Sequence, residues 1–276
     1  MKKIPIIGII FLSLIFTNTK HQLGRDKDPK TIYDISPIKL WSKKTTWSVL
    51  STPGMRFMVN LMYPKSTITH FKADNAVAFT IDDGFCGIDN PEGDMTKEVR
   101  ELFKSYDAHA TFFVTGSHCQ HTKKEDVELL LIDGHEIANH SMYDMPYNKF
   151  NQEDFEDDFD QTQNILLQYT DNIPNWYRAP HGKLSKTMQK VIDDKGFIHI
   201  VCDGFANDTA IPDPEWIAKF ILKKIKPGSI ILIHMPERGI REWNYRAMEL
   251  TLQGLKDRNL DILNLSELHS LHNSNK

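Results

Sequence analysis

Between residues 67 and 270 the sequence alternates short β-favouring runs with amphipathic helical stretches, and this alternation restricts the fold more than any other feature. Strands separated by helices pair in parallel, because the crossover returns the chain to the same end of the sheet. About seven such repeats fit this length, which favours closure into a small (β/α) barrel. The sequence therefore predicts one α/β domain built around parallel strands.

Hydrophobic periodicity and the residues that cap or break helices set the expected elements. Strands are expected at residues 76–81, 110–114, 134–139, 176–180, 197–201, 229–233 and 261–263. Helices are expected at residues 95–106, 123–132, 151–169, 185–194, 214–224 and 245–256. Asn151 is the expected N-cap of the longest helix.

The first 19 residues are typical of a signal peptide or a signal anchor. Lys2 and Lys3 precede an apolar run from Ile4 to Phe16, which is shorter than the roughly 20 residues of a spanning helix. No Ala-x-Ala cleavage site follows this run, so an uncleaved anchor stays open as the alternative. We expect a protein that is secreted to the cell-wall side, with membrane contact only through this segment.

The segments that flank the domain are expected to be irregular. Residues 20–66 are polar and interrupted by prolines, which indicates a linker and a lead-in that wraps the domain. Trp41 and Trp47 in this segment are expected to pack on the domain. Residues 271–276 are expected to form a polar tail.

Composition limits the class of protein. A chain of 276 residues with 40% hydrophobic residues can bury a large core, and we expect a monomer. The formal net charge of −4 gives no support to nucleic-acid binding, and it would become −6 if the two N-terminal lysines were removed with a signal peptide.

The apolar run Ala76–Ile81 leads directly into Asp82, Asp83 and Gly84. Catalytic groups gather at the carboxyl ends of strands in parallel α/β folds. Two adjacent carboxylates repel each other unless a cation or an arginine offsets their charge. The alternative is a solvated Asp-Gly turn, but the polar residues at the ends of later predicted strands weigh against this alternative.

Polar residues also follow other predicted strands. His140 and Asp144 are spaced four residues apart, so on one face of a helical turn both could reach one metal ion. Arg178 begins a turn that contains proline and glycine, Asp208 follows the next strand, and His234 ends the most apolar strand. One such residue could occur by chance, but the ordered series indicates an active site.

This pattern resembles the NodB-type polysaccharide deacetylases, carbohydrate esterase family 4, over roughly residues 70–270. The family's Thr-Phe-Asp-Asp-Gly corresponds to Thr80–Gly84, and its Arg-x-Pro-x-Gly to Arg178–Gly182. Its Leu-x-His corresponds to Leu232–His234. The chain departs from the family at Asp144, where a second histidine is usual, and at Thr209, where tryptophan is frequent.

The resemblance implies a distorted (β/α) barrel that removes N-acetyl groups from a chitin- or peptidoglycan-type glycan. It implies one divalent metal ion, Zn²⁺ in the first place, with Co²⁺ or Mn²⁺ as alternatives. By position, Asp82 would be the general base, oriented by Arg178. His234 would be the general acid, positioned by Asp208.

The other roles implied by the resemblance concern the metal and the substrate. Asp83 and His140 would bind the metal, and we expect Asp144 to replace the second histidine as the third ligand. The backbone N–H of His181, in a turn that ends at Gly182, would stabilise the oxyanion. Leu232 would contact the acetyl methyl group.

The three cysteines leave two interpretations open. In an exported protein, Cys86 and Cys119 would follow two neighbouring strands at the same end of the barrel, so a disulfide between them is possible. In the other interpretation, both residues and Cys202 are small apolar residues with unpaired thiols.

Two alternatives to an active glycan deacetylase remain. One is a deacylase of another amide or ester, because Asp144 and Thr209 alter the pocket. The other is a catalytically impaired, glycan-binding protein on the same fold. The joint presence of Asp82, Arg178 and His234 weighs against the impaired, glycan-binding alternative, because glycan binding alone needs neither a base nor an acid.

Overall fold

The computed structural model describes residues 35–51 and 54–274, so the expected signal segment lies outside the described residues. Its strands are β1 (Ala76–Gly84), β2 (Thr111–Val114), β3 (Glu136–Asn139), β4 (Trp176–Tyr177), β5 (Ile198–His199), β6 (Gly204–Phe205), β7 (Ile230–His234) and β8 (Asp261–Leu263). Its helices are α3 (Pro37–Leu50), α4 (Met55–Met62), α5 (Thr96–Ser105), α6 (Lys124–Ile132), α7 (Gln152–Leu166), α8 (Lys186–Asp194), α9 (Pro214–Lys224), α10 (Trp243–Lys256) and α11 (Leu265–Ser274). Two short 3₁₀ turns, η1 (Gly116–Cys119) and η2 (Pro180–Gly182), follow β2 and β4.

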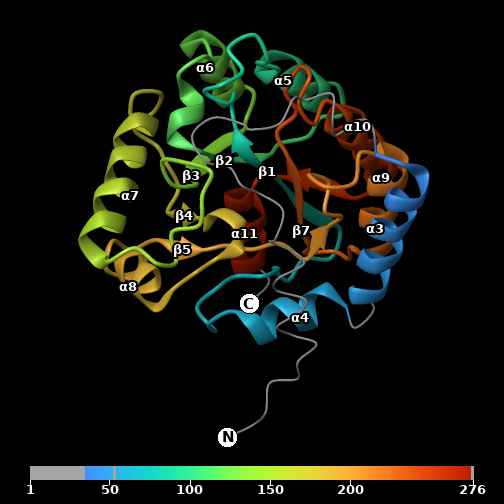
Figure 1. The fold of residues 1–276 in the computed structure, drawn as a ribbon, viewed down its shortest axis with the longest axis horizontal. Coiled ribbons are helices and arrows are strands. Elements are labelled where there is room, and N and C mark those ends of the chain that lie inside the picture. Colours follow the sequence, from blue (N-terminus) through green and yellow to red (C-terminus); the bar gives the residue numbers. More distant parts are fainter. Residues whose placement is uncertain (1–34, 52–53, 275–276) are drawn as a thin grey trace, which may run out of the picture.

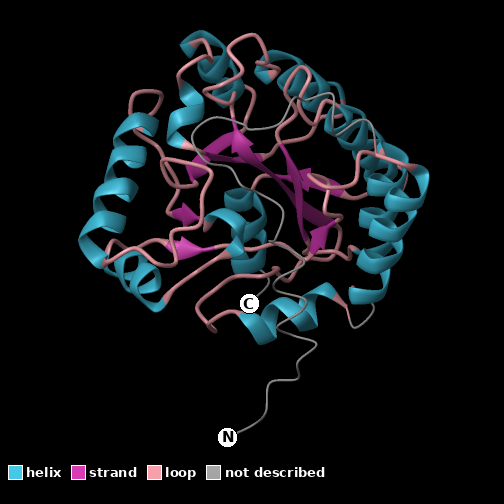
Figure 2. Cartoon of the chain, viewed as in Figure 1, coloured by secondary structure: helices cyan, strands magenta, loops and turns pink. Residues whose placement is uncertain are grey.

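The strands form one parallel sheet in the order β5-β4-β3-β2-β1-β7-β6, and β8 pairs with the start of β1. The sheet curls into a half-barrel, and most helices lie around its outer face (Figures 1 and 2). The parallel α/β barrel expected from the sequence is therefore confirmed. Its expected strands are all present, and β6 is an additional strand of two residues.

Strand β1 is the centre of the fold, because it pairs with three other strands and all nine of its residues are buried. Side chains alternate between the two faces of a strand. Val77, Phe79 and Ile81 belong to the large core that includes the outer helices, whereas the small Ala76 and Ala78 belong to the inner core. The same alternation directs Thr80 and Asp82 toward the inside of the barrel.

The lead-in connects the edge strand β5 with the start of β7, which is next to the other edge strand β6. Ile68 bridges to Ile200 beside β5, and His70 bridges to Ser229 at the start of β7. The backbone N–H of Phe71 donates to the carbonyl of Gly228 at 2.8 Å. Residues 68–71 therefore bridge β5 and β7, which do not pair with each other directly.

The expectation that residues 20–66 are irregular is wrong for its described part, which contains α3 and α4. Ser36 caps α3 and Pro37 occupies its first turn, so the proline begins a helix instead of breaking one. Trp47 packs edge-on against Phe205, with ring centroids 5.4 Å apart. Trp41 remains 67% exposed, so the packing expected for it does not occur.

Helix α11 closes the barrel at the amino-terminal ends of the strands. Leu265 and Leu268 are fully buried in the inner core, and the N–H of Leu265 donates to Thr111 Oγ1 at 2.8 Å. The helix continues to Ser274, so most of the expected polar tail at residues 271–276 is helical instead.

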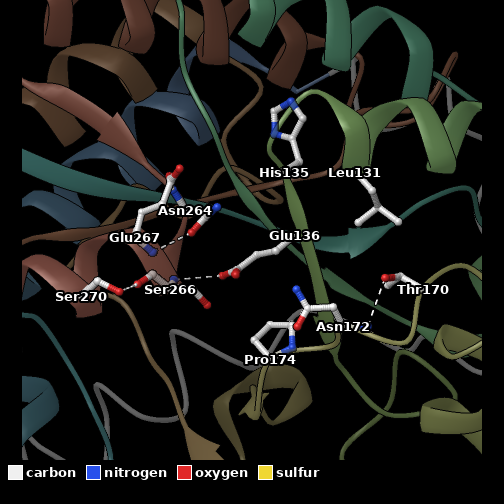
Figure 3. Close-up of a pocket in the computed structure, with 10 residues that line it drawn as sticks. All are labelled: Leu131, His135, Glu136, Thr170, Asn172, Pro174, Asn264, Ser266, Glu267 and Ser270. Carbon is white, nitrogen blue, oxygen red and sulfur yellow. Dashed lines mark hydrogen bonds between the residues drawn. The ribbon is translucent and has the colours of Figure 1, made fainter.

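A cavity of about 510 Å³ lies at this same end of the barrel (Figure 3). Glu136, at the start of β3, and Ser266, in α11, line it, and the N–H of Ser266 donates to Glu136 Oε1 at 3.2 Å. The polar strand ends singled out in the sequence lie at the opposite end of the strands. Separately, none of the helices in the described ranges is long and apolar enough to cross a membrane.

Candidate active site

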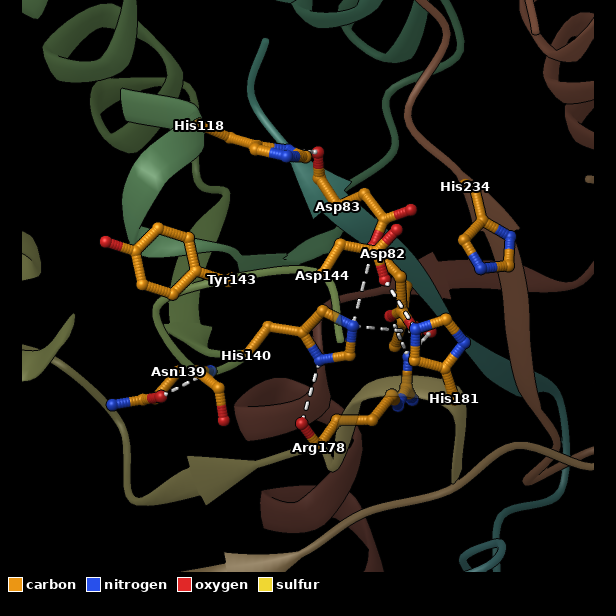
Figure 4. Close-up of polar contacts among 12 residues, drawn as sticks. Asp82, Asp83, His118, Asn139, His140, Tyr143, Asp144, Arg178, His181 and His234 are labelled. Atoms are coloured by element: carbon orange, nitrogen blue, oxygen red, sulfur yellow. Dashed lines mark hydrogen bonds and ion pairs between the residues drawn. The ribbon is translucent and has the colours of Figure 1, made fainter. Parts of the chain in front are cut away.

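Asp82 and Asp83 lie at the carboxyl end of β1, where the pairing with β2 shifts register between Asp82 and Gly84. Asp83 has a φ of 60°, in the left-handed region that non-glycine residues seldom occupy. Neighbouring side chains of a regular strand point to opposite faces. The irregular backbone at Asp83 interrupts this alternation, and both carboxylates contact His140 (Figure 4).

Arg178 follows β4 and holds the first of these acids. Its Nη1 atom donates to Asp82 Oδ1 at 2.5 Å and to Thr80 Oγ1 at 2.8 Å, and its guanidinium lies 4.0 Å from the centroid of the Phe113 ring. All four side chains are buried. Because Arg178 fixes one carboxylate oxygen, Asp82 has a defined orientation inside the barrel.

His140 follows β3 and presents one ring nitrogen to both acids. Its Nδ1 atom lies 2.8 Å from the backbone carbonyl of Arg178, and a carbonyl can only accept, so Nδ1 carries the proton. Its Nε2 atom lies 3.6 Å from Asp83 Oδ1 and 3.9 Å from Asp82 Oδ2. Burial lowers the pKa of His140, but the two carboxylates outweigh it and raise this pKa. The site thus favours a positive charge at Nε2, carried by a proton or by a metal ion.

His234 ends β7, opposite Asp82 on β1. Its Nδ1 atom lies 3.0 Å from Asp208 Oδ1, and its backbone N–H donates to Asp208 Oδ2 at 2.8 Å. Asn244 Nδ2 also donates to Asp208 Oδ2, at 2.7 Å. Burial opposes the charged imidazolium, but Asp208 outweighs burial and raises the pKa of His234 to about 9.

Asp144 does not lie in a helical turn with His140, so the geometry expected from their spacing is wrong. The residues between them form a loop without regular structure, and Ser141 has a φ of 65°. Asp144 Oδ1 instead lies 3.1 Å from His181 Nε2. His181 belongs to η2 and has a φ of 56°, and the carbonyl of Gly182 in the same turn accepts from the Tyr63 hydroxyl at 2.7 Å.

Leu232 lies two residues before His234, on the same face of β7. It is 6% exposed and pairs with Thr80 on one side and Phe205 on the other. This side chain lines the barrel next to the general-acid candidate. The aromatic ring of Phe205 lies 5.9 Å from the imidazole of His234, measured between centroids.

Arg241 is a site residue that the sequence reasoning did not identify. Its Nη1 atom donates to Asp83 Oδ2 at 2.6 Å, and its Nη2 atom lies 3.7 Å from Glu237 Oε1. Burial would raise the pKa of Asp83, but Arg241 and His140 hold this pKa well below its usual value. Arg241 lies in the loop between β7 and α10 with a φ of 54°, and no motif in that loop predicted its position.

The residues present fit a metal ion in part. Two donors each about 2.0–2.2 Å from an ion can be 3.6 Å apart, as Asp83 Oδ1 and His140 Nε2 are. Both can act as acceptors when His140 is neutral, with its single proton on Nδ1. In the described ranges no three or more His, Cys, Asp or Glu side chains gather closely enough to form a complete metal site. The position of Asp144 as third ligand therefore stays a prediction.

The possible disulfide between Cys86 and Cys119 does not form. Cys86 Sγ lies 3.0 Å from the backbone carbonyl of Asn90. The Cys119 thiol interacts with the Tyr169 hydroxyl, and its burial raises its pKa to about 12. Each sulfur is thus directed to a neighbour of its own, although both follow strands at one end of the barrel.

Comparisons with known proteins agree with this arrangement. Residues 71–199 match the family model for polysaccharide deacetylase. A peptidoglycan-N-acetylglucosamine deacetylase of Bacillus cereus is 27% identical over 197 residues, which cover 71% of this chain and 88% of the relative. A chitooligosaccharide deacetylase of Bradyrhizobium sp. is 24% identical over 205 residues, which cover 70% of this chain and 90% of the relative.

Solved structures share the fold. The peptidoglycan deacetylase PdaC of Bacillus subtilis superposes with a TM-score of 0.64 at 23% identity, covering 73% of this chain and 93% of that one. A carbohydrate esterase family 4 pseudoenzyme of Bacillus anthracis also superposes with a TM-score of 0.64, at 21% identity, covering 75% of this chain and 69% of that one. The same architecture thus occurs in a deacetylase and in a pseudoenzyme.

Proposed function

We propose that this chain, which belongs to the polysaccharide deacetylase family, hydrolyses N-acetyl groups on a polysaccharide or oligosaccharide that contains N-acetylglucosamine. The observation that carries the proposal is a pair of ion pairs at one end of the barrel: Asp82 with Arg178, and His234 with Asp208. Asp82 and His234 lie opposite each other on the neighbouring strands β1 and β7. Arg178 orients the Asp82 carboxylate and Asp208 keeps the His234 imidazole protonated, so one site holds the base and the acid that amide hydrolysis requires.

Each pair has a role in the reaction. Asp82 accepts the proton of the attacking water, while Arg178 holds the carboxylate in place. His234, charged at neutral pH because of Asp208, delivers a proton to the departing amine nitrogen. The backbone N–H of His181 is the candidate oxyanion donor, and Leu232 is the candidate contact for the acetyl methyl group.

A divalent metal ion, with zinc as the first candidate and cobalt or manganese as alternatives, would be held by Asp83 and His140. Such an ion would polarise the acetyl carbonyl and make a water more acidic. Asp83 and His140 suit such an ion, because one directs a carboxylate oxygen and the other, in its neutral form, Nε2 to the same point. The N-terminal sequence supports action outside the cell, on a wall or extracellular glycan.

Acetate release tests the proposed function. Full-length protein supplied with Zn²⁺ is incubated with N-acetylglucosamine pentamer and, separately, with peptidoglycan, and free acetate is measured. Asp82→Asn should reduce turnover by roughly 10²–10⁴-fold, because the amide cannot accept the proton, while zinc content stays unchanged. Asp171→Asn, at an exposed position, is the control and should match the wild type. Loss of zinc together with activity in Asp82→Asn would show that base and ligand are assigned to the wrong aspartates.

A non-catalytic glycan-binding role is the second candidate, and Arg241 is the observation that favours it. This arginine already donates to the carboxylate that would bind the metal. Binding of the same oligomers without acetate release, under conditions where zinc is bound, would support this role and exclude the deacetylase.

A further inference from the structure

Helix α3 has an outer face that is apolar and exposed. Ile38, Trp41 and Val49 of this helix are 80%, 67% and 64% exposed. With the exposed Thr45 they recur at intervals of three, four and four residues, so they form one apolar stripe along the helix. Trp47, the buried residue of α3, lies on the opposite side of the helix. The helix thus packs on the domain through one face and presents the apolar stripe to solvent on the other.

Helix α4 adds two more exposed apolar side chains. Phe57 and Leu61, one turn apart, are 62% and 61% exposed, whereas Met58 and Val59 between them are buried. The two helices follow each other along the outside of the molecule (Figure 1). Of the eleven large apolar side chains that are exposed in the described ranges, five lie in α3 and α4. Exposed apolar residues that gather in this way indicate an interaction surface.

The charge of this part of the chain is opposite in sign to that of the residues after it. Residues 35–73 contain six lysines and arginines and no aspartate or glutamate, which gives a formal charge of +6. Residues 74–276 contain 21 basic and 34 acidic residues, which gives a formal charge of −13. An anionic surface attracts the first segment and repels the second. Charge therefore favours contact with such a surface through the side that carries α3.

Part of this positive charge is neutralised within the domain. Lys44 forms an ion pair with Asp213 at the start of α9, and Arg56 forms one with the buried Asp203. Lys39, by contrast, is exposed in the first turn of α3, beside the apolar stripe. A lysine in this position can keep its ammonium group among lipid headgroups while the neighbouring apolar side chains enter the bilayer.

We propose that α3 is a membrane-docking helix, whose apolar stripe lies in the interface of a bilayer that contains anionic lipids. Tryptophan favours this interface because its ring is apolar and its N–H is polar, and Trp41 stands in the middle of the stripe. Lysines together with an apolar face are typical of helices that lie on a membrane instead of spanning it. The inference is independent of the proposed deacetylase activity.

The length of the preceding chain agrees with this position. The apolar segment Ile4–Phe16 ends 18 residues before Ile35, the first described residue. A fully extended chain of that length spans about 60 Å. An uncleaved N-terminal anchor would therefore hold α3 close to the membrane, where even a weak contact of the helix with lipid is favoured by the high local concentration.

Helix α6 offers a matched contrast within the same domain. Its Ile132 is 77% exposed and its Leu129 is 41% exposed. The nine residues of α6, however, include three acidic side chains and one lysine, whereas α3 has three lysines and no acid. Apolar exposure is thus similar at the two sites but the charge is opposite, so an anionic bilayer should contact α3 and not α6.

The experiment locates Trp41 relative to lipid. Full-length protein is mixed with vesicles of phosphatidylglycerol and phosphatidylcholine whose acyl chains carry bromine, which quenches tryptophan fluorescence at short range. Part of the fluorescence should be quenched in the wild type, and this part should be lost in Trp41→Phe. Trp216→Phe, which removes a half-buried tryptophan of α9, should retain it. Because the signal comes from Trp41, binding through the N-terminal segment alone does not produce it.

Substitutions test the two components of the contact. Ile38→Ser removes apolar surface and Lys39→Glu reverses a charge, and each should lower the ratio of lipid-contacting to free α3 by about 10-fold. Ile132→Ser in α6 and Lys190→Glu in α8 are the matched controls and should leave the ratio unchanged. Vesicles of phosphatidylcholine alone, or a high salt concentration, should reduce the quenching of Trp41 because the attraction to anionic lipid is then absent or screened.

Three results would overturn the inference. One is equal quenching in the wild type and Trp41→Phe while the protein is bound to vesicles, which would mean that only other segments touch lipid. Another is an equal effect of Ile38→Ser and Ile132→Ser. The last is a dimer in analytical ultracentrifugation without lipid that Ile38→Ser dissociates, since the stripe would then be covered by a second copy of this chain. The substituted positions are exposed, and circular dichroism of each variant shows that its fold is retained.

Discussion

At the scale of single residues, the imidazole of His234 is charged because Asp208 faces it. Its pKa is raised to about 9, above the ordinary value of 6.5. The stabilisation of the folded state by this pair is therefore fully present below pH 6.5, and it is lost as the pH rises through about 9. A general acid is active in its protonated form, so activity should decline over the same alkaline range.

Replacing Asp208 should move that decline. In Asp208→Asn the imidazolium loses its carboxylate while burial still disfavours the charge, so the pKa of His234 should fall by roughly 1–3 units. The alkaline limb of kcat against pH should shift to lower pH by this amount, as measured by acetate release. Asp257→Asn, at an exposed position, should leave the limb in place. An unshifted limb in Asp208→Asn would remove Asp208 from the mechanism.

Much of the residue-level arrangement could be predicted from the strand ends. Asp82, His140, Arg178 and His234 each lie at the carboxyl end of a strand or directly after it, and parallel strands bring their carboxyl ends together. Arg241 could not be predicted, because it reaches Asp83 across 158 residues of sequence from a loop whose left-handed backbone has no signature in the residue types. The loop before Asp144 was predicted wrongly because spacing alone does not determine whether a helical turn forms.

At the scale of elements, helix α3 contributes one fully buried side chain to the core of the domain. Trp47 is 2% exposed, packs against Phe205 and donates through Nε1 to its carbonyl at 3.3 Å. A helix with a single buried residue shows little hydrophobic periodicity, and periodicity therefore did not predict α3. By contrast, α9 has four buried apolar residues and occurs at the predicted bounds. The short strand β8 also occurs at the predicted bounds.

The two tryptophans of α3 provide a matched comparison. Trp47→Ala should reduce the free energy of unfolding by about 3–5 kcal/mol, because a large buried ring is lost and leaves a cavity. Trp41→Ala, in the same helix but exposed, should change it by about 0.5 kcal/mol or less. Urea unfolding followed by circular dichroism measures both. Equal effects of the two substitutions would show that α3 does not dock through Trp47.

At the scale of the whole molecule, the beginning and the end of the domain hold each other. The backbone N–H of Lys72 donates to His272 Nδ1 at 3.0 Å, and Phe71 contacts the rings of His269 and His272. Strand β8 pairs with the first residues of β1, and α11 covers the inner core beneath them. The central strand therefore obtains its last neighbours from the final segment of the chain.

This contact between the two ends affects how the protein can be made. A nascent chain that emerges from the ribosome cannot complete its core until the last helix is available, so most of the chain is synthesised before the barrel can close. Chains that stop at residue 260 should be digested rapidly by a protease under conditions in which the full-length chain resists, as gel electrophoresis would show. Equal resistance of both would mean that the barrel forms without its closing segment.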